Sequence, residues 1–205
     1  MHKEILTSSQ VKLLDLISEY SKAFYLAGGT AVALYIGHRQ SIDFDLFTDS
    51  DLKPKSIKTK LAGGNIQYRV IHEAYDQLHI LTNDVKITFF QYPFDIPHEV
   101  KFENVIKMPE LIDLAAMKAF ALGGRAKWKD YVDIYFILRD HFSIHEIGRR
   151  SNELYKDAFN LKLFRQQLAY FKDIDYSESV NFVSEKPDNE EILKFLIKAA
   201  TEPFI

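Results

Sequence analysis

The chain has 205 residues, a mass of 23.8 kDa and a formal net charge of −3, with 47% hydrophobic and 27% charged residues. This composition is that of an ordinary globular protein rather than a disordered or fibrous one, and the length suits one domain or two small ones. The charge balance argues against a surface coated with basic residues for bulk nucleic-acid binding, although a local basic groove stays open. Because there is no cysteine, disulfides, zinc–thiolate sites, iron–sulfur ligation and a cysteine nucleophile are excluded.

No segment predicts a membrane span or a secretion signal. The chain starts Met-His-Lys-Glu and continues as a mixed polar and apolar stretch, without the apolar core of a signal peptide. Residues 24–37, the longest run free of charge, include two adjacent glycines and are fewer than the roughly 20 apolar residues that a membrane helix needs. We therefore expect a soluble, cytoplasmic protein with no membrane contact.

The start of the chain alternates between helix and strand. Ser8 and Ser9 can cap a first helix, in which apolar residues recur at helical spacing. Residues 24–27 are typical of a short buried strand, which the two glycines interrupt. An apolar helix is predicted over residues 30–35, with Gly37 near its C-terminal cap.

Strand patterns dominate the middle of the chain. Residues 42–47 alternate apolar and polar side chains, as a half-buried strand does. A short lysine-rich helix is predicted over residues 53–61. The turn at residues 82–84 predicts a hairpin between the last two of three further strands. These three predicted strands are residues 66–71, 77–81 and 85–92.

From about residue 108 the pattern becomes mostly helical, and long helices are predicted over residues 108–123 and 127–140. The change of pattern places a boundary between Tyr92 and Met108. Two later helix starts have the residue spacing of a capping box, in which a polar cap is followed three residues later by an acid. The two pairs are Ser143 with Glu146 and Asp188 with Glu191.

The segment Gly28-Gly29-Thr30 lies between a predicted strand and a predicted helix. The free N–H groups and the dipole at a helix start favour an anion there, and glycine lets a phosphate approach the backbone closely. Turns of this kind also occur without any ligand, so the segment alone does not decide between a phosphate site and an ordinary strand-to-helix turn.

Asp43 and Asp45 are two residues apart on a predicted strand, so both carboxylates point to the same face. Two like charges side by side are costly unless a cation lies between them or one is protonated. Carboxylate oxygens are hard ligands that suit magnesium or manganese. The alternative is a solvent-facing strand edge, which the short distance from the glycine turn disfavours.

A basic stretch follows in the helical part. Residues 118–129 contain four basic residues and no acidic one, and Asp130 and Asp133 come next, three apart and thus near neighbours on a helix. Lys129 and Asp133 could instead form a pair on a wet helix surface, which contributes only a few tenths of a kcal/mol. Spacing alone does not separate these two interpretations.

Together these segments resemble the signature of AbiEii/AbiGii-type abortive-infection nucleotidyltransferase toxins. One matching set surrounds the glycines and the paired aspartates, and the other lies in the basic stretch, in the family's order and at a compatible distance. The two sets span residues 24–140. The matching residues are Leu26–Leu34, Gly37–Arg39, Ser41 and Asp43–Phe47 in the first set, and Met117–Lys118, Gly124–Arg125, Lys129–Asp130 and Asp133–Tyr135 in the second.

The resemblance implies an α+β fold of two parts. Residues 1–100 would form a DNA polymerase β-like nucleotidyltransferase core, a mixed sheet with flanking helices. Residues 101–205 would form a mostly helical C-terminal region that completes the active-site cleft.

The resemblance also implies a function. The protein would transfer a nucleoside monophosphate from a nucleoside triphosphate to an acceptor, with Mg²⁺ or Mn²⁺ as cofactor. The acceptor would be RNA such as tRNA. The protein would be the toxin of a toxin–antitoxin or phage-defence pair, with a cognate antitoxin protein as partner.

Residue roles are implied by position. Arg39 falls between the glycines and the paired aspartates, where it either binds a phosphate of the nucleotide or pairs with an aspartate. The other implied nucleotide-binding residues are Gly28, Gly29, Thr30 and Lys118.

Asp43 and Asp45 would hold the metal, and with Asp130 they would be the catalytic acids. Polymerase β-like enzymes usually place a third carboxylate on a neighbouring strand, where it helps to activate the attacking hydroxyl. Here that strand presents Lys86 and Thr88 but no central acid. The sequence therefore departs from the pattern at this one position.

This departure leaves several interpretations open. Asp130 could take the place of the third acid, or the acceptor could be activated weakly. The protein could also be a catalytically degenerate nucleotidyltransferase that binds nucleotide, RNA or a protein without turnover. A further alternative is transfer to a protein hydroxyl, which changes only the acceptor.

Overall fold

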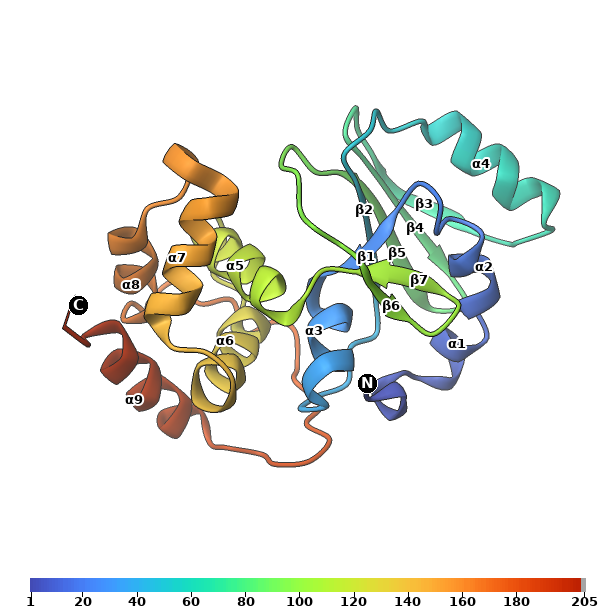
Figure 1. Cartoon of the computed structure of the whole chain (residues 1–205). Helices are drawn as coiled ribbons and strands as arrows, with labels where there is room; N and C mark the ends of the chain where they lie inside the picture. The colour runs from blue at the N-terminus through green and yellow to red at the C-terminus, as the bar shows by residue number, and fades with distance from the viewer. Residues whose placement is uncertain (204–205) are drawn as a thin grey trace.

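The computed structural model describes residues 1–203 and is a mixed α+β structure (Figure 1). Its central sheet consists of β1 (Tyr25–Ala27), β2 (Phe44–Thr48), β3 (Arg69–Glu73), β4 (Gln77–Thr82) and β5 (Val85–Gln91), in the order β1-β2-β5-β4-β3. β2 runs antiparallel to β1 and parallel to β5, whereas β5, β4 and β3 form an antiparallel meander. The predicted mixed sheet and the predicted hairpin between β4 and β5 are confirmed.

The sheet has an apolar and a polar face, because side chains alternate along each strand. Phe44 on β2 and Phe89 on β5 are fully buried on the apolar face. Tyr20, from the chain before β1, packs edge-on against Phe89 with ring centroids 4.9 Å apart. The polar face carries Asp45, which lies beside Thr88 in the β2–β5 register. This second face therefore carries the candidate chemistry.

Helix α3 (Gly28–Ile36) follows β1 directly and lies between the sheet and the C-terminal helices (Figure 1). It begins at Gly28 and is capped by Gly37, both with φ of +68°. Side chains strongly disfavour this left-handed backbone region, so glycine is suited to both ends. Residues 30–34 are buried, as their apolar pattern predicts.

A second, two-stranded sheet was not predicted. β6 (Val100–Phe102) and β7 (Ile106–Met108) pair antiparallel, and β7 lies next to β1. Each strand has only three residues, which is too short for an alternating pattern to be recognised. In Figure 1 this hairpin lies beside the central sheet rather than among the C-terminal helices.

The C-terminal helices pack together on the other side of α3 (Figure 1). Among the described helices, none has both the length and the apolar character needed to cross a bilayer. The remaining α-helices are α1 (Ser8–Val11), α2 (Leu14–Ser18), α4 (Pro54–Gly63), α5 (Leu111–Leu122), α6 (Trp128–Asp140), α7 (Ile144–Tyr155), α8 (Leu161–Leu168) and α9 (Asn189–Ala200), with short 3₁₀ turns η1 (Lys3–Ile5) and η2 (Lys156–Ala158).

The predicted helix starts are mostly correct. The Ser143 hydroxyl accepts from the backbone N–H of Glu146, whose carboxylate accepts from the Ser143 backbone in return, so the predicted capping box is present. Asp188 caps α9 by accepting from the Glu191 N–H. At the first helix the cap is Thr7, one residue before the predicted serines, because Gln10 completes a capping box with it.

The connection between α8 and α9, residues 169–188, crosses back over the molecule and is named the return segment below. At its first anchor, the Asp175 N–H donates to the Ala126 carbonyl and the Asp175 carbonyl accepts from Trp128, at 2.7 and 3.0 Å. At its second anchor, the Val183 N–H donates to the His38 carbonyl at 3.0 Å. The return segment therefore contacts both the helical part and the chain just after α3.

We expect Gly28→Ala to lower the free energy of unfolding by about 1–3 kcal/mol, because a Cβ would add left-handed strain and meet Asp45. Gly63→Ala is the matched control, since a Cβ there meets nothing within 4 Å and α4 is helical. It should stabilise the protein by about 0–1 kcal/mol. Urea unfolding followed by circular dichroism measures the free energy of unfolding of both variants. An equal change for the two variants would contradict the close approach of Asp45 to Gly28.

Candidate active site

Two side chains from other segments approach the start of α3 closely. A Cβ atom added at Gly28 would lie 2.1 Å from Asp45 Oδ2, and one added at Gly29 would lie 2.6 Å from Arg39 Nη2. The first backbone N–H groups of a helix have no intrahelical partner and carry partial positive charge, which favours an acid. The two glycines therefore make room for the Asp45 carboxylate and the Arg39 guanidinium at this helix start.

Thr30 holds the chain that leads into β2. Its side chain is buried, and its hydroxyl donates to the Asp43 backbone carbonyl and is hydrogen-bonded to the Ser41 hydroxyl at 2.8 Å. The Gln10 side-chain amide donates to the same Asp43 carbonyl at 3.4 Å. The Thr30 side chain thus positions Asp43, and its hydroxyl is turned toward the protein.

Asp45 on β2 and Asp43, one residue before β2, both lie near Lys86 of β5. Lys86 Nζ on β5 lies 2.9 Å from Asp43 Oδ2, and the charges of both aspartates act on Lys86. Burial raises the pKa of Asp45, which Lys86 partly offsets and the neighbouring Asp43 increases. Burial opposes the charged form of Lys86, but the hydrogen bond and charge of Asp43 outweigh it and raise the pKa of Lys86. The two carboxylates therefore repel each other and attract a cation.

These two carboxylates are the donors that could hold a divalent cation. Nowhere in residues 1–203 do three acids or histidines converge into a metal site made by the protein alone. Mg²⁺ commonly uses one or two carboxylates together with substrate phosphates, so the pair fits an ion that binds with a nucleotide. The Lys86 ammonium beside Asp43 shows that a positive charge is accommodated at this place.

The strand beside β2 carries no acid on the polar face. Lys86 and Thr88 of β5 lie there, as the alternation predicts, while Asp84 is in the hairpin turn with φ of +61°. The row continues from Thr88 to His79 on β4. Burial, with the neighbouring His72, lowers the pKa of His79. A third strand carboxylate is thus absent from the described part of this face.

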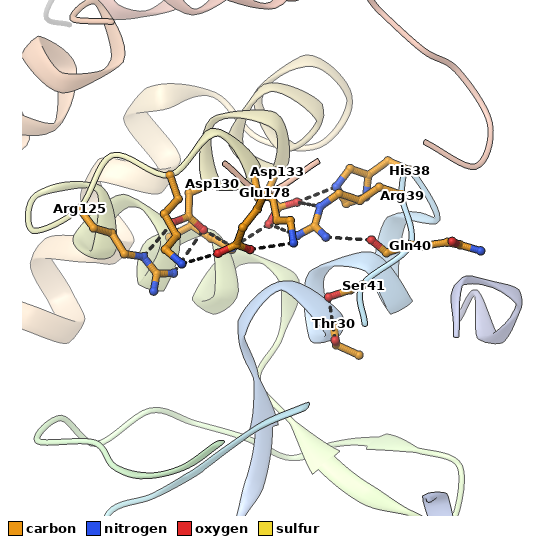
Figure 2. Close-up of polar contacts among 12 residues, drawn as sticks. Thr30, His38, Arg39, Gln40, Ser41, Arg125, Asp130, Asp133 and Glu178 are labelled. Atoms are coloured by element: carbon orange, nitrogen blue, oxygen red, sulfur yellow. Dashed lines mark hydrogen bonds and ion pairs between the residues drawn. The ribbon is translucent and has the colours of Figure 1, made fainter. Parts of the chain in front are cut away.

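A buried ion cluster on the helical side is centred on Asp133 of α6 (Figure 2). Its carboxylate accepts from Arg39 Nε and Nη2 at 2.7 and 2.9 Å, and from His38 Nε2 at 2.8 Å. Lys118 Nζ on α5 lies 2.6 Å from Asp133 Oδ2. All four side chains are buried. Burial disfavours the charged form, but Arg39 and Lys118 hold the pKa of Asp133 well below its ordinary value.

Asp130, one helical turn before Asp133, joins this cluster. Its Oδ1 lies 2.6 Å from Lys118 Nζ, and its Oδ2 accepts from Arg125 Nε at 2.9 Å. Burial opposes ionisation, yet Lys118 and Arg125 lower the pKa of Asp130. Arg125 is 53% exposed and therefore the most accessible of these cations. The charges of Lys118 and Arg125 also act on Asp45, so the helical cluster faces the carboxylates of the sheet.

One acid of the return segment lies beside this cluster. Glu178 is within 2.5 Å of Lys127 Nζ and 2.8 Å of Lys129 Nζ. Figure 2 shows it between Arg125 on one side and Arg39 on the other. Its charge acts on both arginines and on Lys86.

The structure brings the predicted site residues together from four segments. Gly28, Gly29, Asp43 and Asp45 meet at the polar face of the sheet, and Arg39 reaches from there to the helical cluster of Lys118 and Asp130. Of the two roles open for Arg39, the structure shows a pair with an aspartate, Asp133. Sequence reasoning did not single out three residues of the site as functional. They are His38, Lys86 and Glu178.

Comparison with known proteins gives a family match. Residues 12–202 match the model of the family described as nucleotidyl transferase AbiEii toxin, type IV TA system. The uncharacterized protein aq_aa25 of Aquifex aeolicus (strain VF5) is 31% identical over 159 residues, which cover 73% of this chain and 74% of that protein.

Solved structures share the fold. MenT4, a nucleotidyltransferase toxin from Mycobacterium tuberculosis H37Rv, superimposes with a TM-score of 0.62 over 94% of this chain and 82% of its own, at 14% sequence identity. JHP933 from Helicobacter pylori gives a TM-score of 0.56 over 95% of this chain and 91% of its own, at 17% identity. The expected nucleotidyltransferase-like α+β fold with a helical C-terminal region is thereby confirmed.

We expect Asp133→Asn to lower the free energy of unfolding by about 3–5 kcal/mol, because it leaves the buried Arg39 and Lys118 without full compensation. Asp140→Asn is the control, since Asp140 pairs with Arg139 on the surface and should change stability by less than about 1 kcal/mol. Urea titration at pH 7 compares the two. A small effect at Asp133 would mean that the cluster does not hold the two parts together.

The same cluster predicts an acid-dependent loss of stability. Because the pKa of Asp133 is lowered in the folded state, its contribution is present above the ordinary carboxylate pKa of about 4 and is lost as pH falls below it. The urea midpoint of the wild type should therefore drop more steeply than that of Asp133→Asn below about pH 5. The same pH dependence of the urea midpoint in the two proteins would contradict the lowered pKa of Asp133.

Proposed function

Because the chain belongs to the AbiEii family of nucleotidyl transferase toxins of type IV toxin–antitoxin systems, we propose that it transfers a nucleoside monophosphate from a nucleoside triphosphate to RNA such as tRNA, with Mg²⁺ or Mn²⁺ as cofactor. Family membership implies the triphosphate substrate and an antitoxin partner. The observation that carries the proposal for this chain is the approach of Asp45 Oδ2 to the glycine at the start of α3.

In this proposal the start of α3 binds the phosphates of the nucleotide. The backbone N–H groups of Gly28, Gly29 and Thr30 precede the first intrahelical hydrogen bond, so they are the donors available to phosphate oxygens. The Thr30 hydroxyl contributes indirectly, because it holds the Asp43 backbone. A side chain at Gly28 would meet the Asp45 carboxylate, and one at Gly29 would meet the Arg39 guanidinium. Either side chain would also obstruct a phosphate at the start of α3.

Asp43 and Asp45 would hold the divalent cation, and Lys86 would have to give up its contact with Asp43. When bound, the ion would neutralise negative charge on the phosphates of the nucleotide. Such an exchange would relieve the repulsion between the two carboxylates, since a doubly charged ion would compensate both.

Lys118 and Arg125 would provide positive charge toward the nucleotide from the helical side, together with Arg39. Asp130 fixes the positions of Lys118 and Arg125 through its two oxygens. Its lowered pKa keeps it ionised, which suits the fixing of these cations better than the removal of a proton from the acceptor. Asp130 would thus complete the site mainly as a positioning residue.

The reaction itself needs little covalent chemistry from the protein. An acceptor hydroxyl oxygen would form a bond to the α-phosphorus, the bond between that phosphorus and the bridging oxygen would break, and pyrophosphate would leave. The hydroxyl proton would pass to water, since the neighbouring strand β5 carries no acid on the described polar face. Exposed cations beside the candidate site, Arg125 among them, support a polyanionic acceptor such as RNA.

We expect Asp43→Asn and Asp45→Asn each to reduce transfer by at least about 100-fold while leaving the fold intact, because the site that would hold the divalent cation loses one negative charge. Asp49→Asn is the matched control, since Asp49 is exposed just beyond the other end of β2. Transfer is measured from α-labelled triphosphates, and folding from circular dichroism. Chelation of the metal should abolish transfer by the wild type. Full activity of the double variant would remove this site from the mechanism.

The acceptor is tested with each α-labelled triphosphate, total RNA and cell extract depleted of RNA. Label in RNA of tRNA size is the expected outcome, and its removal by ribonuclease confirms the acceptor. Label in protein would instead identify a protein hydroxyl as the acceptor. Magnesium-independent binding of nucleotide without any label transfer would instead favour a catalytically degenerate protein.

A further inference from the structure

The return segment places an acid against two lysines at the start of α6. Glu178 contacts Lys127 Nζ and Lys129 Nζ at 2.5 and 2.8 Å through its two different oxygens. Lys127 is the N-terminal cap of α6, and Lys129 lies in the first turn of this 13-residue helix. The carboxylate is thus an anion bound by two ammonium groups at a helix start, where an anion is favoured.

Backbone contacts fix the position of Glu178. Three residues before it, Asp175 is paired with the chain at Ala126 and Trp128, and three residues after it Asn181 accepts from the Gln40 N–H at 2.8 Å. The return segment is therefore held on both sides of Glu178, by the helical part and by the chain after α3. The contact with the two lysines does not depend on a long unsupported loop.

Five cations interact with the charge of Glu178. Lys127 and Lys129 contact its carboxylate directly. Its negative charge also stabilises the charged forms of Arg39, Arg125 and Lys86. The two lysines hold the pKa of Glu178 at about 2, so it stays negatively charged at neutral pH. A substrate phosphate that binds at these cations therefore competes with an anion of the protein itself.

We propose that Lys127 and Lys129 form a phosphate-binding subsite that Glu178 occupies until substrate displaces it. The phosphate belongs either to the nucleoside triphosphate or to the backbone of the RNA acceptor, so the assignment rests on the proposed function. A phosphate presents two oxygens to the two ammonium groups as the carboxylate does, and it carries at least as much charge. Glu178 then sets the affinity of this subsite for polyanions and excludes weakly charged anions.

An ordinary surface ion pair behaves differently. Glu190 and Lys194 form such a pair on α9, with both side chains about three-quarters exposed and no second lysine on the acid. Removal of the Glu190 charge frees one lysine on α9, away from the candidate site. Removal of the Glu178 charge frees two lysines at the start of α6. The two acids therefore make a matched test.

The test measures binding of tripolyphosphate to the full chain by calorimetry, without divalent metal and with chelator present. Glu178→Gln should tighten this binding by about two- to fivefold, because the competing charge is lost and the side-chain shape is kept. The double variant Lys127→Met with Lys129→Met should weaken it by about tenfold. Glu190→Gln should leave it unchanged. A second arm replaces tripolyphosphate with an RNA oligonucleotide that has a 5′-hydroxyl end.

The two arms identify the source of the phosphate. Tighter tripolyphosphate binding by Glu178→Gln assigns the subsite to the triphosphate, whereas tighter RNA binding alone assigns it to the acceptor backbone. The proposal is overturned if Glu178→Gln changes the affinity for neither ligand, or if Glu190→Gln tightens binding as much as Glu178→Gln does. It is also overturned if Glu178→Gln still tightens binding in the Lys127→Met, Lys129→Met background. Since metal-free binding needs no turnover, a positive result stands even if no nucleotidyl transfer is found, and a negative one does not affect the transfer assay.

Discussion

The carboxylate of Asp133, buried among positive groups, is the interaction on which the arrangement of this protein depends. An ionised carboxylate without water is very costly unless its charge is paired and its oxygens are hydrogen-bonded. Here Arg39 and His38 reach it from the chain after α3, and Lys118 reaches it from α5. Burial keeps His38 mainly neutral, so the imidazole serves as a hydrogen-bond donor while the two cations supply the charge. The buried Asp133 cluster thereby joins the sheet part to the helical part.

This junction also determines where the reactive groups lie. The Arg39 side chain that binds Asp133 passes Gly29 at the start of α3, and Lys118 is shared between Asp133 and Asp130. The carboxylates of Asp43 and Asp45 therefore face a set of fixed cations across the start of α3. Transfer of a phosphoryl-type group requires mainly charged groups held in position. Here the aspartates supply negative charge and the cations of the helical side supply positive charge. The glycines permit the close approach, since larger residues would separate the two sets.

Local patterns in the sequence were sufficient for much of this structure. The alternation around Asp43 and Asp45, the glycines that begin and end α3, and the Ser143 capping box depend on neighbouring residues, and each could be predicted. Glu178 could not, because its partners are some fifty residues earlier in the chain and only the tertiary fold brings them together. The same holds for His38 with Asp133. The three-residue strands β6 and β7 were missed because a periodic pattern needs more residues to be recognised.

The most direct test of the central claim is a crystal structure with Mn²⁺ and a nucleotide whose bridging oxygen between the α- and β-phosphates is replaced by a methylene group. The account predicts an anomalous peak between the carboxylates of Asp43 and Asp45, with Lys86 moved away from Asp43 and phosphate oxygens at the backbone of Gly28 and Gly29. A nucleotide bound elsewhere, with the Lys86–Asp43 pair intact and no ion beside β2, would contradict it.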